Sequence, residues 1–487
     1  MMNTQETHCI FRNIRRNGVR SIGYCLVNGL AKGLATGLSG AVIALYSPWG
    51  LAADEAGTGS GASQGASSGA SAVTAPRSQG AGNNRGGAEA SNGGGNSEYA
   101  SAVDSGRAPW EIGTVGGRNS VRMGPVDVIP FVRVNYEFND NPGRTEDPDS
   151  DDASNGIITQ AEVAFHTDYR DHSANLALSL EDGHYFDSTE DDYTNGRADA
   201  ELNLVATRRN RFRLAGYYGW ETEERGTGIS IGQSVTENDE YDIRGYSGDY
   251  FFGAPSARGQ LSAGASHNER RYDDGDREGF NYDDDEVRAG FRYRHSGITS
   301  FSVGVSEIRT RYLDDDPLER DSDQQEVQLG MTWDPRGRST LDGTVGYQWR
   351  EVLPTGEETS APSWRIIWDW ELASHSRVNV YTGQTFEEAD SVGDVTLSTT
   401  AGVGWTQAWL ERFSTSAGYE FTNDDSEDLE TEVETNTQVH LFTLEGRYAI
   451  RRWLDTGITY EFERQDSDIS GGDYDVNRLM IFMSATL

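Results

Sequence analysis

The sequence predicts an all-β protein, a transmembrane antiparallel up-and-down β-barrel of about 18 strands (16–18), preceded by a signal peptide and a disordered Gly/Ser-rich tail. Three observations favour this fold. From about residue 125, a unit of about 40 residues repeats to the C-terminus. Each unit contains two runs in which apolar and polar residues alternate, the period that places side chains on opposite faces of a strand. The connections between these runs are alternately short turns and long acidic loops, which is typical of outer-membrane barrels.

The composition supports a barrel over a bundle of membrane helices. Hydrophobic residues make up 35% of the chain, mean hydropathy is −0.65, and beyond the N-terminus there is no apolar stretch long enough for a helical span. A barrel hides its membrane signal because only every second residue faces lipid. The net charge of −38 argues against nucleic acid as a partner. Acidic loops on an aqueous face account for that charge more simply.

Residues 1–53 are interpreted as a signal peptide. Arginines between 12 and 20 form a basic n-region, residues 34–46 form an apolar core, and Ala52 and Ala53 supply small residues before Asp54. Both cysteines, Cys9 and Cys25, lie inside this segment, so the mature chain is expected to contain none. Such a chain crosses an oxidising periplasm without disulfide errors.

Lipidation of Cys25 is the alternative for this segment. The residues before it, Ile22-Gly23-Tyr24, match a lipobox poorly, and the better apolar core follows the cysteine. The signal peptide is therefore the preferred interpretation.

Residues 54–122 form a low-complexity Gly/Ser/Ala/Asn tail, and residues 123–487 form the barrel domain. The tail lacks periodicity and cannot bury enough apolar surface to offset its chain entropy, so we expect a flexible periplasmic segment. Residues 109–112 are the one apolar segment of the tail, and the docking of a periplasmic partner on them is an alternative. A barrel plug is a further alternative, although plugs usually need a folded core.

The predicted strands have one apolar and one polar face. The first covers residues 126–138, with Val132, Val134, Tyr136 and Phe138 on one face. Tyr and Trp gather toward strand ends, as in an interfacial aromatic girdle; they include Trp220, Tyr250, Trp333, Trp349, Trp364, Trp368, Trp370, Trp405, Trp453 and Tyr460. The opposite faces carry too many charges to form a second buried core, so we expect them to line an aqueous lumen.

Loop length predicts the sidedness of the barrel. With a periplasmic N-terminus, the short turns carrying Arg170, Arg208, Arg336, Arg412 and Arg451 face the periplasm. The acidic loops then face outward; they are expected at residues 139–156, 187–192, 223–237, 273–283, 314–323, 424–434 and 465–475.

No motif points to catalysis, and the protein is expected not to be an enzyme. The histidines of the mature chain do not form a His-x-x-x-His pair, and no nucleophile elbow, Walker loop or Rossmann fingerprint lies in a suitable context. His166 near Asp168 is the one fragment that an outer-membrane hydrolase could use. A solvated lumen histidine is the simpler interpretation.

The acidic loops suggest weak calcium binding at Asp466, Asp468 and Ser470. Asp-x-Asp-x-Ser-Gly is the start of a calcium loop, but Asn477 stands where a bidentate acid is expected at the twelfth position. Diffuse binding of divalent cations that bridge to anionic glycolipid, or an ordinary solvated loop, are the alternatives. No other cofactor is expected.

Arginines on the polar faces are candidate determinants of lumen selectivity. A ring of arginines selects anionic solutes such as acidic sugars. The candidates are Arg211, Arg213, Arg288, Arg292, Arg365 and Arg447. The alternative is that each arginine pairs with a lumen carboxylate and only packs the barrel wall.

Two segments give the chain a family resemblance. The first strand ends Tyr136-Glu-Phe138-Asn-Asp140-Asn141-Pro142, and a late hairpin runs Tyr448-Ala-Ile-Arg451-Arg452-Trp453, continuing through Tyr460 to Ser467. These segments resemble the outer-membrane β-barrel porin family associated with exopolysaccharide export. The resemblance implies an outer-membrane role near polysaccharide secretion and no catalytic residue.

Two functions are expected from these observations. The first is an outer-membrane pore for export or passage of polysaccharide or other polar solutes. The alternative is a non-conducting structural barrel whose acidic loops organise surface polysaccharide or divalent cations. Either would sit in the bacterial outer membrane, with outer-membrane lipid and lipopolysaccharide as partners.

Overall fold

The computed structural model describes residues 121–146, 153–233, 235–273, 275–313, 320–335, 338–353, 355–388, 393–429 and 433–486. The predicted signal peptide, all but the last residues of the predicted tail, and parts of the acidic loops at 139–156, 223–237, 273–283, 314–323 and 424–434 lie outside these ranges. Arg336 in its predicted turn lies outside them as well. No helix in the described ranges is long and apolar enough to cross a membrane.

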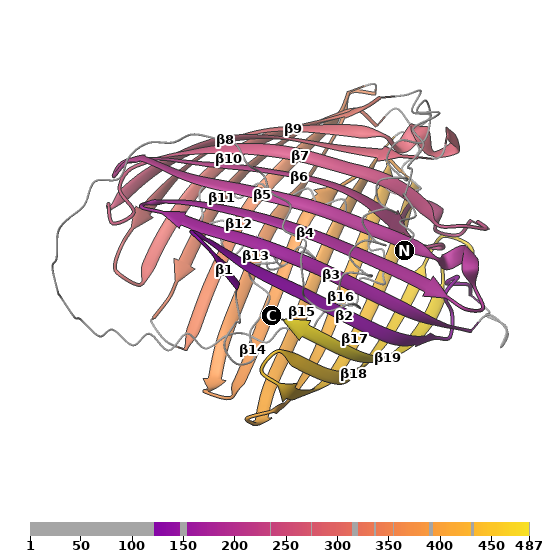
Figure 1. The fold of residues 1–487 in the computed structure, drawn as a ribbon. Helices are drawn as coiled ribbons and strands as arrows, with labels where there is room; N and C mark the ends of the chain where they lie inside the picture. The colour runs from indigo at the N-terminus through magenta and orange to yellow at the C-terminus, as the bar shows by residue number, and fades with distance from the viewer. Residues whose placement is uncertain are drawn as a thin grey trace, which may run out of the picture. The chain divides into compact units, whose positions relative to one another are not determined.

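One antiparallel sheet of 19 strands contains all the described strands (Figure 1). The strands are β1 (Val121–Met123), β2 (Val126–Asn139), β3 (Ser154–Tyr169), β4 (His172–Tyr185), β5 (Tyr193–Thr207), β6 (Asn210–Glu223), β7 (Asp239–Phe252), β8 (Gly259–Tyr272), β9 (Tyr282–Arg294), β10 (Thr299–Tyr312), β11 (Ser322–Trp333), β12 (Ser339–Val352), β13 (Glu357–Ala373), β14 (Ser376–Glu387), β15 (Val395–Leu410), β16 (Phe413–Asp428), β17 (Val433–Arg451), β18 (Leu454–Ser467) and β19 (Tyr474–Thr486). Short 3₁₀ turns η3 (Thr189–Asp191), η4 (Gly228–Ser230) and η5 (Gly275–Phe280) lie in the longer loops.

The sheet closes on itself between its first and last long strands. β19 pairs with β2 from Arg478 opposite Asn139 to Thr486 opposite Phe131, and every other long strand pairs with its neighbours in the chain. Leaving out the three-residue β1, 18 strands form the closed barrel. The predicted all-β, 18-stranded antiparallel barrel is therefore confirmed.

The short strand β1 was not predicted. It pairs with residues 126–128 at the start of β2, beyond the point where β19 ends opposite Phe131. Because a closed barrel staggers its strands, β2 would otherwise leave these backbone groups unpaired at one edge.

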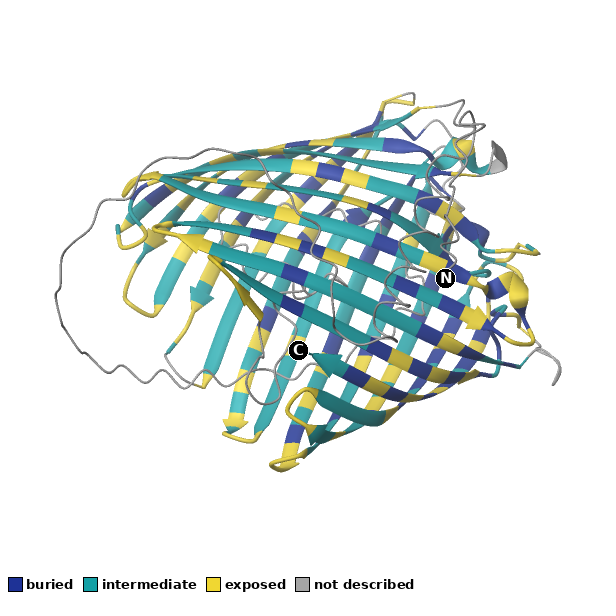
Figure 2. Cartoon of the chain, in the orientation of Figure 1, coloured by how far each residue is buried: buried dark blue, intermediate teal, exposed yellow. Residues whose placement is uncertain are grey.

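The alternating sequence pattern explains the two faces of the wall. Figure 2 shows buried and exposed residues alternating along the strands. On β2 the polar residues Arg133, Asn135, Glu137 and Asn139 are buried and point inward, whereas the apolar residues between them are exposed on the outer face. Apolar side chains thus face outward along the wall. This arrangement is the inverse of that in a soluble protein, and it suits a barrel surrounded by lipid.

Several of the tryptophans of the predicted girdle are exposed on the outer face. Exposed examples are Trp333, Trp349, Trp368, Trp370, Trp405 and Trp453. Trp368 and Trp370 stack with their ring centroids 5.3 Å apart and their planes at 8°. Amphipathic rings of this kind are favoured at the level of the lipid headgroups.

The two ends of the barrel differ in loop length. At one end the strands are joined by short turns, such as the two residues between β3 and β4 or between β5 and β6. At the other end the connections are longer, up to the segment 224–238 between β6 and β7. We assign the short-turn end to the periplasm, because bacterial barrels have short periplasmic turns and long outer loops.

Candidate functional site: the lumen and its outer mouth

All six candidate arginines point into the lumen, and four of them form ion pairs with carboxylates on the same or nearby strands. The pairs are Arg213–Glu201 (2.8 Å), Arg288–Asp249 (2.7 Å), Arg288–Glu286 (2.8 Å), Arg365–Asp342 (3.8 Å) and Arg447–Glu445 (3.2 Å). For these four, the geometry agrees with the alternative in which arginines balance charge within the wall. Their role in selectivity remains a prediction.

Arg211 and Arg292 have different surroundings near the periplasmic end. The guanidinium of Arg211 lies over the ring of Phe251, 5.2 Å from its centroid, and its Nε is buried without a hydrogen-bond partner among the described residues. The guanidinium of Arg292 lies within electrostatic reach of the arginines at 211 and 294. Arg211 and Arg292 therefore lie near one another at the periplasmic end of the lumen.

A belt of tyrosines inside the outer mouth was missed by the sequence analysis. Each lies near the outer end of a strand, and its hydroxyl donates a hydrogen bond to a glutamate. The pairs are Tyr185–Glu137 (3.0 Å), Tyr193–Glu181 (2.8 Å), Tyr241–Glu221 (3.0 Å), Tyr272–Glu223 (3.0 Å), Tyr312–Glu388 (2.8 Å) and Tyr474–Glu463 (2.8 Å). We call these pairs the tyrosine–glutamate belt.

The sequence does contain a signal for this belt. Its tyrosines and its strand glutamates occupy the polar, inward face of the alternation, whereas girdle aromatics occupy the apolar face. Buried tyrosine hydroxyls need hydrogen-bond partners, and the glutamates provide them. The alternation of odd and even positions along each strand could therefore have separated the inward tyrosines of the belt from the outward tyrosines of the girdle.

The segment 224–238 packs over one side of the outer mouth. Arg225 forms a bidentate pair with Asp191 in the loop after β4, with both bonds at 2.7 Å. Glu224 forms an ion pair with Arg144 in the loop after β2, and Ile229 is buried against Tyr241 and Tyr272. This segment therefore joins its own strands to two other loops.

The same segment also reaches the loop between β18 and β19. Gly232 lies so close to Ile469 and Ser470 that an added Cβ would collide with them. Around the closed barrel, β6 is separated from β19 by β2 to β5. The segment 224–238 therefore covers the β2–β5 side of the mouth.

The end of β14 covers the opposite side. The β13–β14 ladder ends at Trp364 opposite Gln384, and the chain then bends so that the Glu388 carboxylate contacts Arg350 (2.5 Å) and the Tyr312 hydroxyl (2.8 Å). Because Tyr312 lies on β10, this contact crosses three intervening strands. The outer mouth is thus narrowed from two sides by side chains that are mostly buried.

The predicted calcium ligands are tied to neighbouring groups. The Asp466 carboxylate pairs with Arg464 at 2.7 Å, and that of Asp468 accepts a hydrogen bond from the backbone N–H of Asn436 at 3.1 Å. Ser470 follows in the loop to β19. An arginine on Asp466 competes with a cation, so the calcium site remains a prediction without geometric support.

A different cluster of metal-ligating types lies on the outer wall. Donor atoms of His267, Glu269 and Asp283 lie within 4.8 Å of one another. Arg271 donates to both carboxylates, at 3.0 Å to Glu269 and closely to Asp283. The guanidinium already neutralises this cluster, and the geometry favours a surface salt-bridge network.

His166 lies on the inner face between two polar partners. Its ring nitrogens contact Asn175 (2.5 Å) and Asp168 (3.0 Å). Neither partner is a nucleophile, so the contacts correspond to a hydrogen-bonded wall histidine and not to the base of a catalytic triad.

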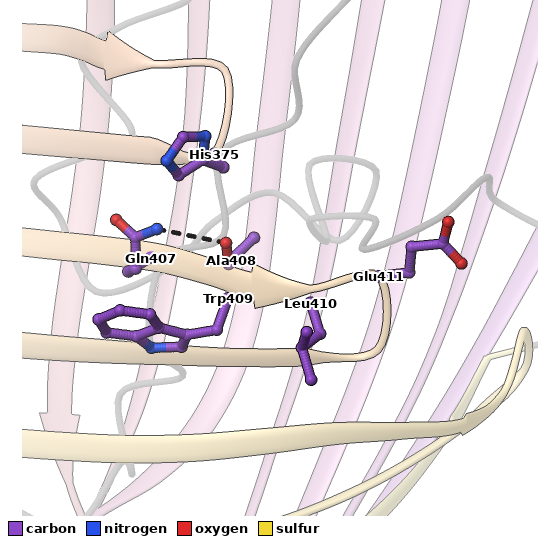
Figure 3. Close-up of a pocket in the computed structure, with 6 residues that line it drawn as sticks. All are labelled: His375, Gln407, Ala408, Trp409, Leu410 and Glu411. Carbon is purple, nitrogen blue, oxygen red and sulfur yellow. Dashed lines mark hydrogen bonds between the residues drawn. The ribbon is translucent and has the colours of Figure 1, made fainter.

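A hollow of about 540 Å³ lies at the periplasmic rim, where β13 turns into β14 and β15 into β16 (Figure 3). The Ala408 N–H donates to the carbonyl oxygen of His375 at 2.8 Å, and the ladder shifts register between Ala408 and Leu410. The shift leaves consecutive side chains exposed, Trp409 at 56% and Leu410 at 71%. An exposed tryptophan at this height is typical of interfacial anchoring.

Solved structures match the chain at low identity and low TM-score. The chain is 13% identical to Pseudomonas aeruginosa OpdQ, covering 75% of this chain and 99% of that chain with a TM-score of 0.41. It is 11% identical to a BenF-like porin from Pseudomonas fluorescens Pf-5, covering 74% and 99% with a TM-score of 0.42. It is 10% identical to the FrpB iron transporter from Neisseria meningitidis, with a TM-score of 0.39, covering 69% of this chain and 62% of the transporter's length. No curated protein matches the chain.

A closed 18-stranded barrel with an apolar outer face and a polar lumen defines a porin-like pore of the bacterial outer membrane. The chain belongs to the family described as Putative beta-barrel porin 2, whose model matches residues 116–486. The match confirms the resemblance to β-barrel porins, the outer-membrane location and the expectation of a non-enzymatic protein. The family description names no cargo.

Proposed function

We propose that this barrel passes polar solutes, polysaccharide among them, across the outer membrane. The observation that carries the proposal is a lumen wall on which polar residues predominate, with hydroxyl and glycine residues on two of its strands. The inward positions of β10 include Ser300, Ser302, Gly304, Ser306 and Thr310, and those of β15 include Thr396, Ser398, Thr400, Gly402, Gly404 and Thr406.

Such a wall suits a hydroxylated solute for two physical reasons. Hydroxyl groups exchange hydrogen bonds with water or with sugar hydroxyls at small net cost, so a solute can move without being held. The small side chains also leave room, whereas the ion pairs of the other strands fill their side of the lumen with balanced charge.

Support for polysaccharide comes from the family resemblance, and its motif residues sit at the barrel seam. Asp140 accepts hydrogen bonds from the backbone N–H (2.6 Å) and Nδ2 (2.8 Å) of Asn477. The Asn141 Nδ2 donates to the carbonyl oxygen of Asp475 at 3.1 Å. These contacts fasten β2 to β19, so the motif has a role in closing the barrel that is independent of cargo.

A non-conducting barrel is the second candidate, and the narrowed outer mouth favours it. Buried contacts of Arg144, Arg350 and Glu388 draw loops over the lumen from two sides. In that case the acidic loops would organise surface polysaccharide, lipopolysaccharide or divalent cations, and the N-terminal tail would recruit a periplasmic partner.

Single-channel recording of the purified full-length protein in a planar bilayer tests the proposal. Stepwise openings that neutral maltooligosaccharides block reversibly are the expected result. As a matched pair, Thr400→Trp should lower conductance because its side chain enters the lumen, whereas Val403→Trp on the outer face of the same strand should not. A folded barrel that stays silent would support the structural role.

A further inference from the structure

The barrel wall contains a break in its backbone pairing between β13 and β14. Their ladder runs from the periplasmic turn to Trp364 opposite Gln384 and stops there. Beyond that point β13 still pairs with β12, as far as the residue opposite Val352, and β14 still pairs with β15, as far as Glu387 opposite Thr396. Within the described part of the chain, residues 357–363 therefore have a backbone partner on one side only. We call this break the β13–β14 seam.

A proline lies on the unpaired edge of β13. The Gln384 Nε2 donates to the carbonyl oxygen of Pro362 at 2.7 Å, so this carbonyl points toward β14. In an antiparallel ladder the N–H and C=O of one residue point to the same neighbour, and proline has no N–H to offer. Proline is accordingly found on edge strands. Gln384 also accepts a hydrogen bond from Thr399 on β15 at 2.9 Å, so a side chain bridges the base of the seam.

The end of β14 passes on the lumen side of β13 instead of beside it. The Phe386 N–H donates to the side-chain oxygen of Gln348 at 3.4 Å. Arg350 donates to the carbonyl oxygen of Glu387 at 3.3 Å and pairs with the carboxylate of Glu388. Gln348 and Arg350 are buried side chains on inward positions of β12. The backbone of β14 is thus bonded to side chains two strands away, beneath β13.

Apolar side chains close the seam where the two edges overlap. Phe386, Val395, Val352 and Ala361 form one buried cluster. Val352 and Ala361 lie on inward positions of β12 and β13. Phe386 and Val395 continue the outward positions of β14 and β15. The outer face of one edge therefore packs against the inner face of the other, and these strands can separate without breaking a backbone ladder.

The seam lies at the height of the outer leaflet. Pro362 is opposite Tyr347 and Ser360 is opposite Trp349, and both of these aromatic residues are exposed on the outer face of β12. Such rings mark the membrane interface, so the base of the seam at Trp364, nearer the periplasm, lies in the apolar belt. Unpaired backbone edges are costly in the hydrocarbon region, and a passive wall has no need of one.

We propose that the β13–β14 seam is a lateral gate through which an amphiphile with a hydroxylated headgroup leaves the lumen for the outer leaflet. The headgroup follows the hydroxyl-bearing inward face of β15, which adjoins the seam. The apolar chain takes the place of Phe386 against Ala361 and enters lipid without crossing water. The inference rests on the proposed pore function and specifies a class of cargo and its exit route.

A transfer assay in lipid vesicles tests the gate. Vesicles containing the full-length protein, with Cys9 and Cys25 replaced by serine, are loaded with radiolabelled maltotriose and a trace of dodecyl maltotrioside. External glucoamylase cleaves only the headgroups that reach the outside. We expect the protein to release maltotriose and to expose the internal dodecyl maltotrioside to the enzyme, and protein-free vesicles to do neither.

Cross-linking the seam separates a lateral exit from passage through the outer mouth. In A361C/F386C, a short bis-methanethiosulfonate reagent joins the two overlapping edges. We expect loss of dodecyl maltotrioside transfer, continued release of maltotriose, and recovery of the transfer on reduction. V305C/V327C is the matched control, because these outward residues lie opposite one another in the continuous β10–β11 ladder, and cross-linking them should change neither rate.

A second variant leaves the apolar cluster in place. Gln384→Ala removes the bridge to Pro362 and should speed the transfer of dodecyl maltotrioside while leaving maltotriose release unchanged. Continued transfer through the cross-linked seam would overturn the gate in favour of exit through the outer mouth. Release of maltotriose without transfer of the amphiphile would also overturn it and would leave the pore function intact.

Distance measurements decide the gate in a barrel that passes neither solute, a result that would defeat the pore function by itself. Spin labels at Ser360 on β13 and Thr399 on β15 should give a broad distance distribution that lengthens when dodecyl maltotrioside is added. Labels at Val305 on β10 and Tyr347 on β12, also two strands apart, should give a narrow one that does not change. Equally narrow, unchanging distributions for both pairs would refute the gate.

Discussion

The guanidinium of Arg144, in the loop after β2, lies 3.5 Å from the carboxylate of Glu463 on β18, and both side chains are almost completely buried. Arg144 also pairs with Glu224 of the segment 224–238, and Glu463 pairs with Arg478 at 3.0 Å. Burial acts to lower the pKa of Arg144, but the charges of Glu224 and Glu463 outweigh it and raise that pKa above its usual range. Because the raised pKa lies far above physiological pH, this arginine stays charged and fastens the segment to the barrel seam.

Replacing Arg144 should loosen the outer mouth. In Arg144→Gln, Glu224 and Glu463 lose a buried partner, which typically costs about 3–5 kcal/mol when one member of such a pair is removed. We expect a lower midpoint of urea unfolding, and larger or noisier single-channel currents because the segment 224–238 no longer covers the mouth. Arg170→Gln, in an exposed periplasmic turn, is the control; equal currents in both variants would contradict a role for the segment in narrowing the mouth.

Breaking the ion pair between Arg213 and Glu201 should change the ion preference of the pore. Their charges cancel at 2.8 Å, so Arg213→Gln should shift permeability toward cations and Glu201→Gln toward anions. The double variant should return near the wild type, with a coupling energy of roughly 0.5–3 kcal/mol in a stability cycle. Reversal potentials in a salt gradient measure this, and additive single effects would show that the two charges act independently.

Gly183 should not tolerate a side chain. It lies opposite Tyr193 of the tyrosine–glutamate belt, and an added Cβ would overlap the tyrosine ring. Gly183→Ala should therefore destabilise the barrel by about 1–3 kcal/mol, the usual cost of overpacking. Gly404→Ala is the matched control, because nothing lies within 4 Å of its added Cβ; urea unfolding in micelles should leave that variant near the wild type.

Charge should be tolerated on the lumen face and not on the lipid face. Leu329 is 60% exposed on the outer side of β11, and Leu329→Arg should cost about 2–4 kcal/mol near the bilayer midplane. Thr400→Arg, on an inward position of β15, should cost little because water solvates its charge. Unfolding free energies in lipid vesicles measure both, and a reversed order would mean that the two faces are assigned wrongly.

The barrel could be predicted from sequence because its wall obeys a local rule. The alternation of residues along each strand was enough to assign the correct faces. It placed Trp333 and Trp349 on the outer face and Arg213 and Arg365 on the inward face. The ion partners of the arginines were not predicted, because Asp249 contacts Arg288 across an intervening strand and such register is invisible in a single strand. The inward bend at Glu388 and the glutamate partners of the belt tyrosines were missed for the same reason, although alternation alone would have placed those tyrosines on the inward face.

The sequence by itself determined the strand number, the two faces of the wall and the opposite character of the two ends, because a two-residue period and loop length are properties of neighbouring residues. Only the tertiary structure decided which charges neutralise one another, which arginines lie near one another at the periplasmic end of the lumen, and how the loops narrow the outer mouth. Those relationships join residues far apart in the chain, such as Arg144 and Glu463, and barrel closure alone brings them into contact.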